Sequence, residues 1–304
     1  MPQQHLSTPP EFDRAVERRR DAEWLAERLT DPTTRVVPVW RERNLVTRGD
    51  DPRPVLLSLA DAERFIREPG APILLGQDDE AAYFAVELPG DDPVTEFDLR
   101  GELVDLHHIG ARLAPRDAAI LAHARAMTYW HRRHRFCGEC GAETTSAEAG
   151  HLRICSRQGC AALHFPRVDP CVIVLVSSGD RCLLVRQPSW PQGRYSSIFG
   201  FVEPGESIEE AVVRQVAQET GVAVTDVHYR ASHPWPFPSA LMLGLLARAT
   251  DETLRPNASG PDDARWFSRD ELERLVTANK LLLPSDAPIA LALIREWLDA
   301  PVPT

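Results

Sequence analysis

The sequence lacks any long apolar run. No segment of the 304 residues approaches the roughly 18 consecutive apolar residues that a membrane-spanning helix needs. We also expect no secretory leader, because the stretch from Met1 to Pro10 is polar and contains proline instead of an apolar core. We therefore expect no membrane partner and a cytoplasmic location.

Net positive charge is lacking as well. The formal net charge is −11, and lysine is nearly absent, with Lys280 as the single copy. Such a balance argues against broad binding to nucleic acid or membrane surfaces by simple electrostatics. It leaves room for a small anionic ligand held by a local arginine cluster. The hydrophobic fraction of 43% is ordinary for a globular protein, and the length suffices for two or three domains.

Residues 1–130 read as a small α/β or α+β domain. Short apolar runs bounded by Gly, Pro or Asp predict strands, Val55 to Leu59 among them. A long helix is expected from Pro115 to His134, since proline suits the first helical turn. The arginines along this helix, including Arg125, are expected to form its solvated face.

Two further parts follow. Residues 131–167 form a small cysteine-bearing insert. Residues 168–304 begin with strongly β segments and end with a helix near residues 286–298, and this order fits a sheet with helices on both faces. No internal repeat is visible. The expected fold class is therefore α/β (α+β) in three parts.

Four of the six cysteines have the spacing of a metal site. Four thiolates form a closed tetrahedral shell around zinc and leave no position for water, so the site should be structural. The second pair is more widely spaced than usual, which keeps His151 and His164 as alternative ligands and free core cysteines as the competing interpretation. Zinc-binding cysteines indicate a reducing compartment. The four candidates are Cys137, Cys140, Cys155 and Cys160.

The most informative stretch runs from Gly200 to Val222 and reads GFVEPGESIEEAVVRQVAQETGV. A helix should begin near Ser207 and end at Gly221, a residue suited to the left-handed conformation that closes helices. Positions 215, 218 and 219 lie three and four apart and share one face. A divalent cation on a diphosphate needs oxygen ligands from one rigid surface of this kind.

This stretch resembles the Nudix box, whose pattern is G, five residues, E, seven residues, then R-E-U-x-E-E-x-G-U with U aliphatic. Two positions depart from it, because Gln215 and Gln218 stand where the family has glutamates that bind magnesium or manganese. The resemblance implies that Arg214 and Glu206 brace the helix. It also implies that Glu219, Gln215 and the backbone of Phe199 hold the metal. The matching residues are Gly200, Glu206, Arg214, Val216, Glu219, Gly221 and Val222.

Downstream, Ser232 to Ala240 reads SHPWPFPSA and is similar to the SQPWPFPxS motif of NADH pyrophosphatases. With the cysteine pairs and the box in the same order, the chain resembles the bacterial members of that family. The resemblance implies a Nudix α/β/α sandwich preceded by a zinc ribbon and a smaller α/β domain, in a homodimer. It implies that Phe165 and Phe201 sandwich the nicotinamide ring. The implied substrate loop consists of His233, Pro234, Trp235, Pro236, Phe237, Pro238, Ser239 and Ala240.

Three functions remain open. The first is metal-dependent hydrolysis of NAD(H) to nicotinamide mononucleotide and AMP, weakened by Gln215 and Gln218. The second is an NAD(H)-binding or regulatory protein, because an amide oxygen can coordinate a cation but cannot offset its charge or act as a general base. The third is a Nudix hydrolase of ADP-ribose or of NAD-capped RNA.

Overall fold

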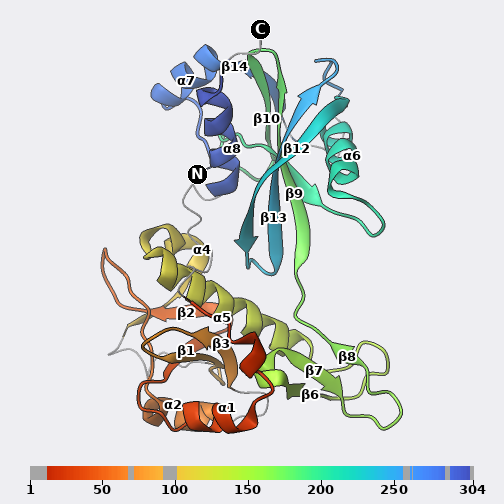
Figure 1. Cartoon of the computed structure of the whole chain (residues 1–304). Coiled ribbons are helices and arrows are strands. Elements are labelled where there is room, and N and C mark those ends of the chain that lie inside the picture. Colours follow the sequence, from red (N-terminus) through yellow and green to blue (C-terminus); the bar gives the residue numbers. More distant parts are fainter. Residues whose placement is uncertain are drawn as a thin grey trace. The chain divides into compact units, whose positions relative to one another are not determined.

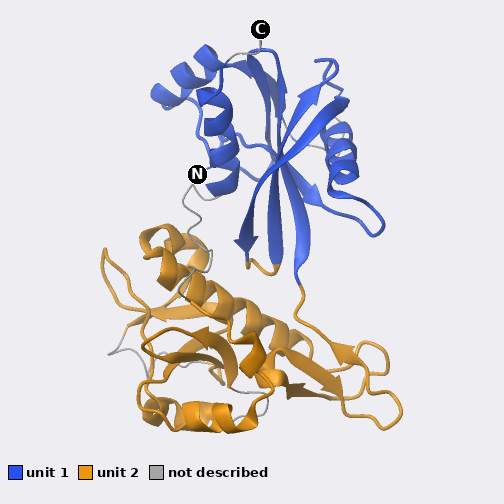
Figure 2. Cartoon of the chain, in the orientation of Figure 1, with its two compact units in different colours: residues 1–4, 168–235, 240–304 blue, residues 5–167, 236–239 orange. Residues whose placement is uncertain are grey.

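The computed structural model describes residues 12–67, 72–91, 101–255, 261, 263–284 and 288–301. These residues fall into two compact units (Figure 2). Unit 1 contains residues 168–235 and the described residues from 240 onward, and unit 2 contains the described residues up to 167 together with Pro236–Ser239. The expected α/β class is confirmed. The three-part boundaries stay a prediction, since the cysteine-bearing insert groups with the N-terminal part in unit 2.

Unit 1 is built on a sheet of order β12-β13-β9-β10-β14, with β11 paired to β9. Strands β13 and β9 run parallel, whereas the other neighbours run antiparallel. The strands are β9 (Asp169–Ser178), β10 (Arg181–Arg186), β11 (Ile198–Phe201), β12 (Val224–Trp235), β13 (Ala240–Ala249) and β14 (Asp263–Ser268). The helices are α6 (Ile208–Thr220), α7 (Arg269–Thr277) and α8 (Pro288–Asp299).

Alternation along β9 gives unit 1 its layers. Val172 and Val174 pack in the same apolar cluster as the buried face of α6. Ile173 and Leu175 point the other way and pack with residues of α7 and α8. Because successive strand residues face opposite sides of a sheet, the apolar run at residues 171–176 of this strand is buried on both faces. The sheet therefore lies between α6 on one face and α7 with α8 on the other (Figure 1).

Unit 2 contains a second sheet, of order β3-β4-β1-β2-β5. Helix α5 packs on one face through β1, β3 and β4, and α2 packs on the other through β1 and β4. The strands are β1 (Arg35–Trp40), β2 (Arg43–Val46), β3 (Ile73–Gln77), β4 (Ala82–Glu87) and β5 (Glu102–Asp105). The helices are η1 (Val16–Arg18), α1 (Ala22–Arg28), α2 (Leu59–Ile66), α4 (Leu106–Ile109), η2 (Gly110–Arg112) and α5 (Pro115–Arg133), so the expected long helix is confirmed.

The two sheets share one topology. Each starts with an antiparallel strand pair, β1-β2 or β9-β10, and continues through a helix, α2 or α6. A second antiparallel pair comes next, and its later strand runs parallel to the first strand of the unit, β4 with β1 and β13 with β9. The last strand then pairs with the second, β5 with β2 and β14 with β10. The chain thus repeats one topology without a visible repeat in its sequence. A layered fold requires buried apolar residues at the right places rather than identical residues.

Unit 2 also carries the cysteine-bearing insert as a sheet of order β6-β7-β8, with a short 3-10 helix, η3 (Glu148–Gly150), before β7. Its strands are β6 (Thr144–Ala147), β7 (Leu152–Cys155) and β8 (Leu163–His164).

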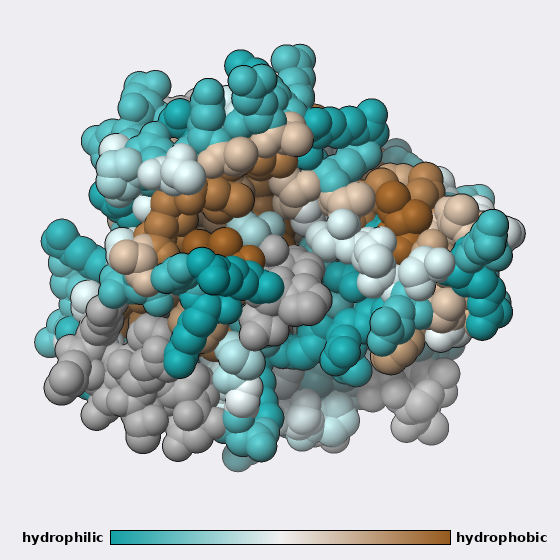
Figure 3. All heavy atoms as spheres, turned by 90° about the horizontal axis from the view of Figure 1, so that it is seen from below, coloured by the Kyte–Doolittle hydropathy of each residue, from teal (hydrophilic) through white to brown (hydrophobic). Residues whose placement is uncertain are grey.

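On the face drawn in Figure 3, hydrophobic residues reach the surface in separate areas bordered by hydrophilic ones. None of the helices within the described ranges is both long and apolar enough to cross a membrane.

Candidate active site

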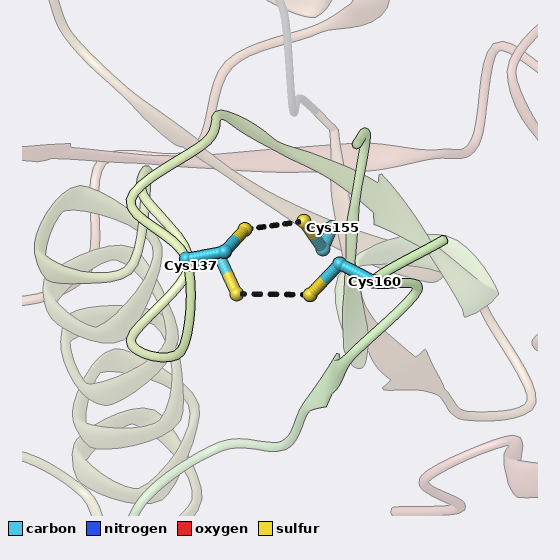
Figure 4. A group of neighbouring side chains, drawn as sticks. Cys137, Cys155 and Cys160 are labelled. Carbon is cyan, nitrogen blue, oxygen red and sulfur yellow. Dashed lines mark hydrogen bonds between the residues drawn. The ribbon is translucent and has the colours of Figure 1, made fainter. Parts of the chain in front are cut away.

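The sulfur atoms of the four predicted cysteines converge in the insert of unit 2. All four lie within 4.8 Å of one another. The Sγ atoms of Cys137 and Cys160 are 3.9 Å apart, and those of Cys140 and Cys155 are 3.4 Å apart (Figure 4). Zinc bound at about 2.3 Å to four sulfurs places them roughly 3.8 Å from one another. The donor set fits a structural zinc ion. The alternative ligand His151 donates a hydrogen bond from Nε2 to the backbone oxygen of Leu74 instead.

The predicted box helix is α6, and its ends are fixed by local contacts. The Ser207 hydroxyl accepts from the backbone N–H of Glu210, and the Glu210 carboxylate accepts from the backbone N–H of Ser207, at 2.8 Å. The helix closes at Gly221, whose φ of 73° is in the left-handed region. A capped terminus of this kind is worth about 1 kcal/mol. Helix α6 is therefore a rigid platform for the side chains at 215, 218 and 219.

Arg214 ties the loop before the helix to the helix itself. Its Nε and Nη2 donate to the two carboxylate oxygens of Glu206, at 2.5 Å and 2.8 Å. Nη2 also donates to the backbone oxygen of Phe201 at 2.9 Å. The hydrogen bonds from Arg214 lower the pKa of Glu206 to about 2, helped by the backbone N–H of Glu203. Glu206 is thus an ionised brace whose oxygens are already engaged.

The metal-binding face predicted from the box carries one carboxylate. Gln215 Nε2 donates to Glu219 Oε1 at 2.7 Å. Arg214 Nη1 donates to the side-chain oxygens of Gln215 and Gln218, at 3.3 Å and 3.2 Å. Glu219 Oε2 is buried and has no hydrogen-bond partner among the described residues. Burial is the main cause that raises the pKa of Glu219, against the lowering effect of its bond with Gln215.

The donor set on α6 fits one cation better than several. A buried carboxylate oxygen that no described residue engages is a suitable ligand for magnesium or manganese, which prefer oxygen donors. Within the described ranges, however, the cysteine cluster is the sole convergence of three or more His, Cys, Asp or Glu ligands. The two amide oxygens carry no charge and already accept from Arg214. A cation at Glu219 would therefore depend largely on the oxygens of its substrate.

Strand β11 lies directly against the side chain of Gln215. A Cβ atom placed on Gly200 would be 2.1 Å from Gln215 Oε1, a distance that real contacts do not reach. The same strand carries Phe199 and Phe201, paired with Ile173 and Cys171 of β9. The missing side chain at Gly200 lets the backbone beside Phe199 approach the predicted ligand residue.

The predicted stacking residues belong to different units. Phe165 is in unit 2 and Phe201 in unit 1. Their side chains are 64% and 58% exposed, as a ring that stacks on a ligand requires.

The predicted substrate loop is the connection between β12 and β13. His233, Pro234 and Trp235 end β12, and Ala240 begins β13 opposite Trp235. His233 is buried, and Trp235 packs against the core of unit 1. The segment Pro236–Ser239 between them, with Phe237 and Pro238, belongs to unit 2. The eight residues therefore do not form one exposed surface.

The expectation that Arg125 lies on a solvated face is wrong, because the residue is 4% exposed. Its Nε donates to the backbone oxygen of Pro236 at 2.9 Å. The guanidinium carbon is 4.7 Å from the ring centre of Phe237. His107 meets the same ring edge-on, with the centroids 5.2 Å apart. Since Arg125 and Pro236 are 111 residues apart in the chain, no local pattern could have joined them.

Comparison with family models divides the chain into three matches. Residues 33–130 match the NADH pyrophosphatase-like rudimentary NUDIX domain, in agreement with the repeated topology. Residues 132–165 match the NADH pyrophosphatase zinc ribbon domain. Residues 166–288 match the NUDIX domain.

Curated relatives match over most of their own length. The NAD-capped RNA hydrolase NUDT12 of Macaca fascicularis is 34% identical over 94% of this chain and 72% of its own. The NAD-capped RNA hydrolase NudC of Mycobacterium bovis is 35% identical over 84% of this chain and 83% of its own. The mitochondrial NAD(P)H pyrophosphatase NUDT13 of Homo sapiens is 34% identical over 75% of this chain and 71% of its own. The chain therefore belongs to the Nudix hydrolases of the NADH pyrophosphatase type.

Proposed function

We propose that this protein hydrolyses the diphosphate of NAD(H) to nicotinamide mononucleotide and AMP in the presence of magnesium or manganese. The observation that carries the proposal is the intact scaffold of α6, in which Arg214 and Glu206 fix the loop next to the buried carboxylate of Glu219. The substrates named for the curated relatives, NAD(P)H and NAD-capped RNA, support the same class of ligand.

The residues of this chain would have three roles: they would bind the cation, hold the loop before α6 in place, and bind the substrate. Glu219 Oε2 would hold the cation, and the hydrogen bond from Gln215 would orient that carboxylate. A bound magnesium or manganese ion supplies positive charge to the diphosphate oxygens. Arg214 would keep the Phe201 carbonyl and Glu206 in place. The exposed ring of Phe201 would stack on the nicotinamide, which fixes the dinucleotide before water attacks phosphorus.

A second function is favoured by one observation, the neutral residues at 215 and 218. Loss of two negative ligands should weaken metal binding by at least the 10–100-fold that changes around a metal site typically cost. The second candidate is therefore an NAD(H)-binding or regulatory protein that hydrolyses its ligand slowly or not at all.

Turnover of NADH with excess Mn²⁺ separates the two candidates. Equal amounts of reduced nicotinamide mononucleotide and AMP support the enzyme, and tight NADH binding without products supports the second candidate. The double variant Gln215→Glu with Gln218→Glu should raise kcat/KM by about 10–100-fold. The matched control is Gln158→Glu, the same change at an exposed residue of unit 2. Absence of both turnover and NADH binding in the unmodified protein would refute both candidates.

Two finer points belong to the proposal. The relatives named as NAD-capped RNA hydrolases support a test with an NAD-capped oligonucleotide beside NADH and ADP-ribose. A homodimer is proposed from the family resemblance, and light scattering of the purified protein measures the molar mass against the 33.9 kDa of one chain.

A further inference from the structure

We propose that Arg125 is a positioning residue for the substrate loop, and that Phe237 anchors the segment Pro236–Ser239 in unit 2. The inference rests on the proposed function, because the loop is the segment that the resemblance assigns to substrate binding.

The composition of the loop explains why it needs an outside partner. Pro234, Pro236 and Pro238 alternate along it. Proline has no backbone N–H, so these three residues cannot donate the hydrogen bonds that usually fix a turn. The backbone N–H groups of Trp235, Phe237 and Ser239 remain, and a donor from elsewhere in the protein adds to these.

Arg125 supplies that donor from α5. Its Nε–H bonds the carbonyl oxygen of Pro236 at 2.9 Å, in a residue that is 4% exposed. The carboxylates of Glu42 and Asp105 are each 3.9 Å from the guanidinium, which is beyond hydrogen-bonding distance. They offset the buried charge without competing for the Nε–H. The bond to Pro236 is therefore a charge-assisted contact made in a dry environment, where such contacts are strong.

The ring of Phe237 makes the second connection. It packs against the α5-bearing core of unit 2, with Arg125 over its face at 4.7 Å and the His107 ring at its edge. Both geometries are favourable for an aromatic ring. Phe237 is half-buried, with these two contacts on its face and at its edge. The segment Pro236–Ser239 is therefore held through the backbone oxygen of Pro236 and through the side chain of Phe237.

A cavity next to the loop indicates how the loop would respond if this connection were broken. Phe237, Pro238 and Arg125 contribute to the lining of a cavity of about 430 Å³ within unit 2. Without the guanidinium, the phenyl ring has free volume to enter. The segment Pro236–Ser239 should then shift rather than remain in place.

The test compares Arg125→Met, Arg125→Lys and Phe237→Leu with the control Arg116→Met. Arg116 is on the same helix, pairs with Asp78, and is not among the residues that line the cavity. Loss of one charge-assisted hydrogen bond should raise the KM for NADH about tenfold in Arg125→Met. Arg125→Lys, which keeps the charge but not the planar donor, should fall between Arg125→Met and the unmodified protein.

Hydrogen exchange gives a readout that does not require turnover. The amides of Trp235, Phe237, Ser239 and Ala240 should exchange faster in Arg125→Met and Phe237→Leu, while those of α6 keep their protection. If the unmodified protein does not hydrolyse NADH, the proposed function fails, but the exchange arm still tests the positioning role. If Arg125→Met does not fold, Phe237→Leu decides. Loop exchange within about twofold of Arg116→Met would overturn the proposal.

Discussion

Restoring one charge beside Glu219 should create a measurable cation site. In the protein, Gln215 donates to Glu219 Oε1 at 2.7 Å. In Gln215→Glu, this hydrogen bond becomes a contact between two carboxylates. At this separation and an effective dielectric constant of about 20, their repulsion is about 6 kcal/mol before the side chains move apart. The variant without metal should therefore be less stable than the unmodified protein, and a divalent cation should recover part of the loss.

The size of the reversal can be worked out from mass action. A second carboxylate should tighten cation binding by about 10–100-fold. At a cation concentration about 100 times the new Kd, binding stabilises the folded state by about 2.7 kcal/mol. For a unit of this size, that raises Tm by roughly 5–10 °C. With its weaker affinity, the unmodified protein should gain at most about half of this free energy at the same concentration.

Thermal unfolding, followed by circular dichroism with and without Mn²⁺, measures both effects. Gln158→Glu again controls for the added charge, since Gln158 is exposed and lies in the insert. An equal rise of Tm in Gln158→Glu, or in the unmodified protein, would show that the charge at 215 does not limit cation binding. The inference that the neutral side chain at position 215 weakens cation binding would then be refuted.

Two further predictions concern unit 2. Burial lowers the pKa of His131 to about 4 from 6.5, although the hydrogen bond between its Nε2 and the Gly150 oxygen acts in the opposite direction. The unfolded chain therefore protonates this histidine at a higher pH than the folded protein does. The free energy of unfolding should fall by about 3 kcal/mol as the pH drops from 6.5 to about 4. Urea titrations across this pH range should show a smaller fall in His131→Gln, and equal slopes would contradict the assignment. Cys155→Ser should abolish stoichiometric zinc in elemental analysis, whereas Cys171→Ser, at a buried cysteine outside the cluster, should retain it; zinc retained in both would contradict the ligand set.

Local patterns predicted the elements whose ends are fixed locally. The box helix was placed between Ser207 and Gly221 because a capping side chain and a left-handed glycine are both readable in the sequence, and the structure places α6 there. The cysteine pairs were readable for the same reason, since ligand spacing is a property of short segments.

A local pattern misled at the start of α2. The segment Val55 to Leu59 was expected to be a strand because it is short and apolar. The structure has only isolated bridges there, Val36 with Leu57 and Val46 with Pro54. Helix α2 then begins at Leu59, after Ser58, whose side chain accepts from the backbone N–H of Asp61. Serine three residues before an acid is a helix-start pattern, and it should have outweighed the apolar run.

Other features depend on contacts between distant parts of the chain. Arg125 contacts Pro236 and Phe237, and these contacts bury it. The residues next to Arg125 in the helix do not indicate these contacts. The repeated topology of the two sheets is equally hidden, because it is a matter of strand order and direction rather than of residue identity. The sequence alone showed that Gln215 and Gln218 are neutral, and the structure shows that they hydrogen-bond to Arg214 and that Gln215 also bonds to Glu219.

The contact between Gly200 and residue 215 determines how easily this protein could change its activity. Glutamine and glutamate have the same shape, so the space that the bare glycine leaves for Gln215 accommodates a glutamate equally well. The backbone at Gly200 therefore leaves room for a glutamate at position 215, although a neutral glutamine occupies it. A glutamate at position 215 therefore requires no movement of this backbone, whereas a side chain gained at position 200 would collide with residue 215.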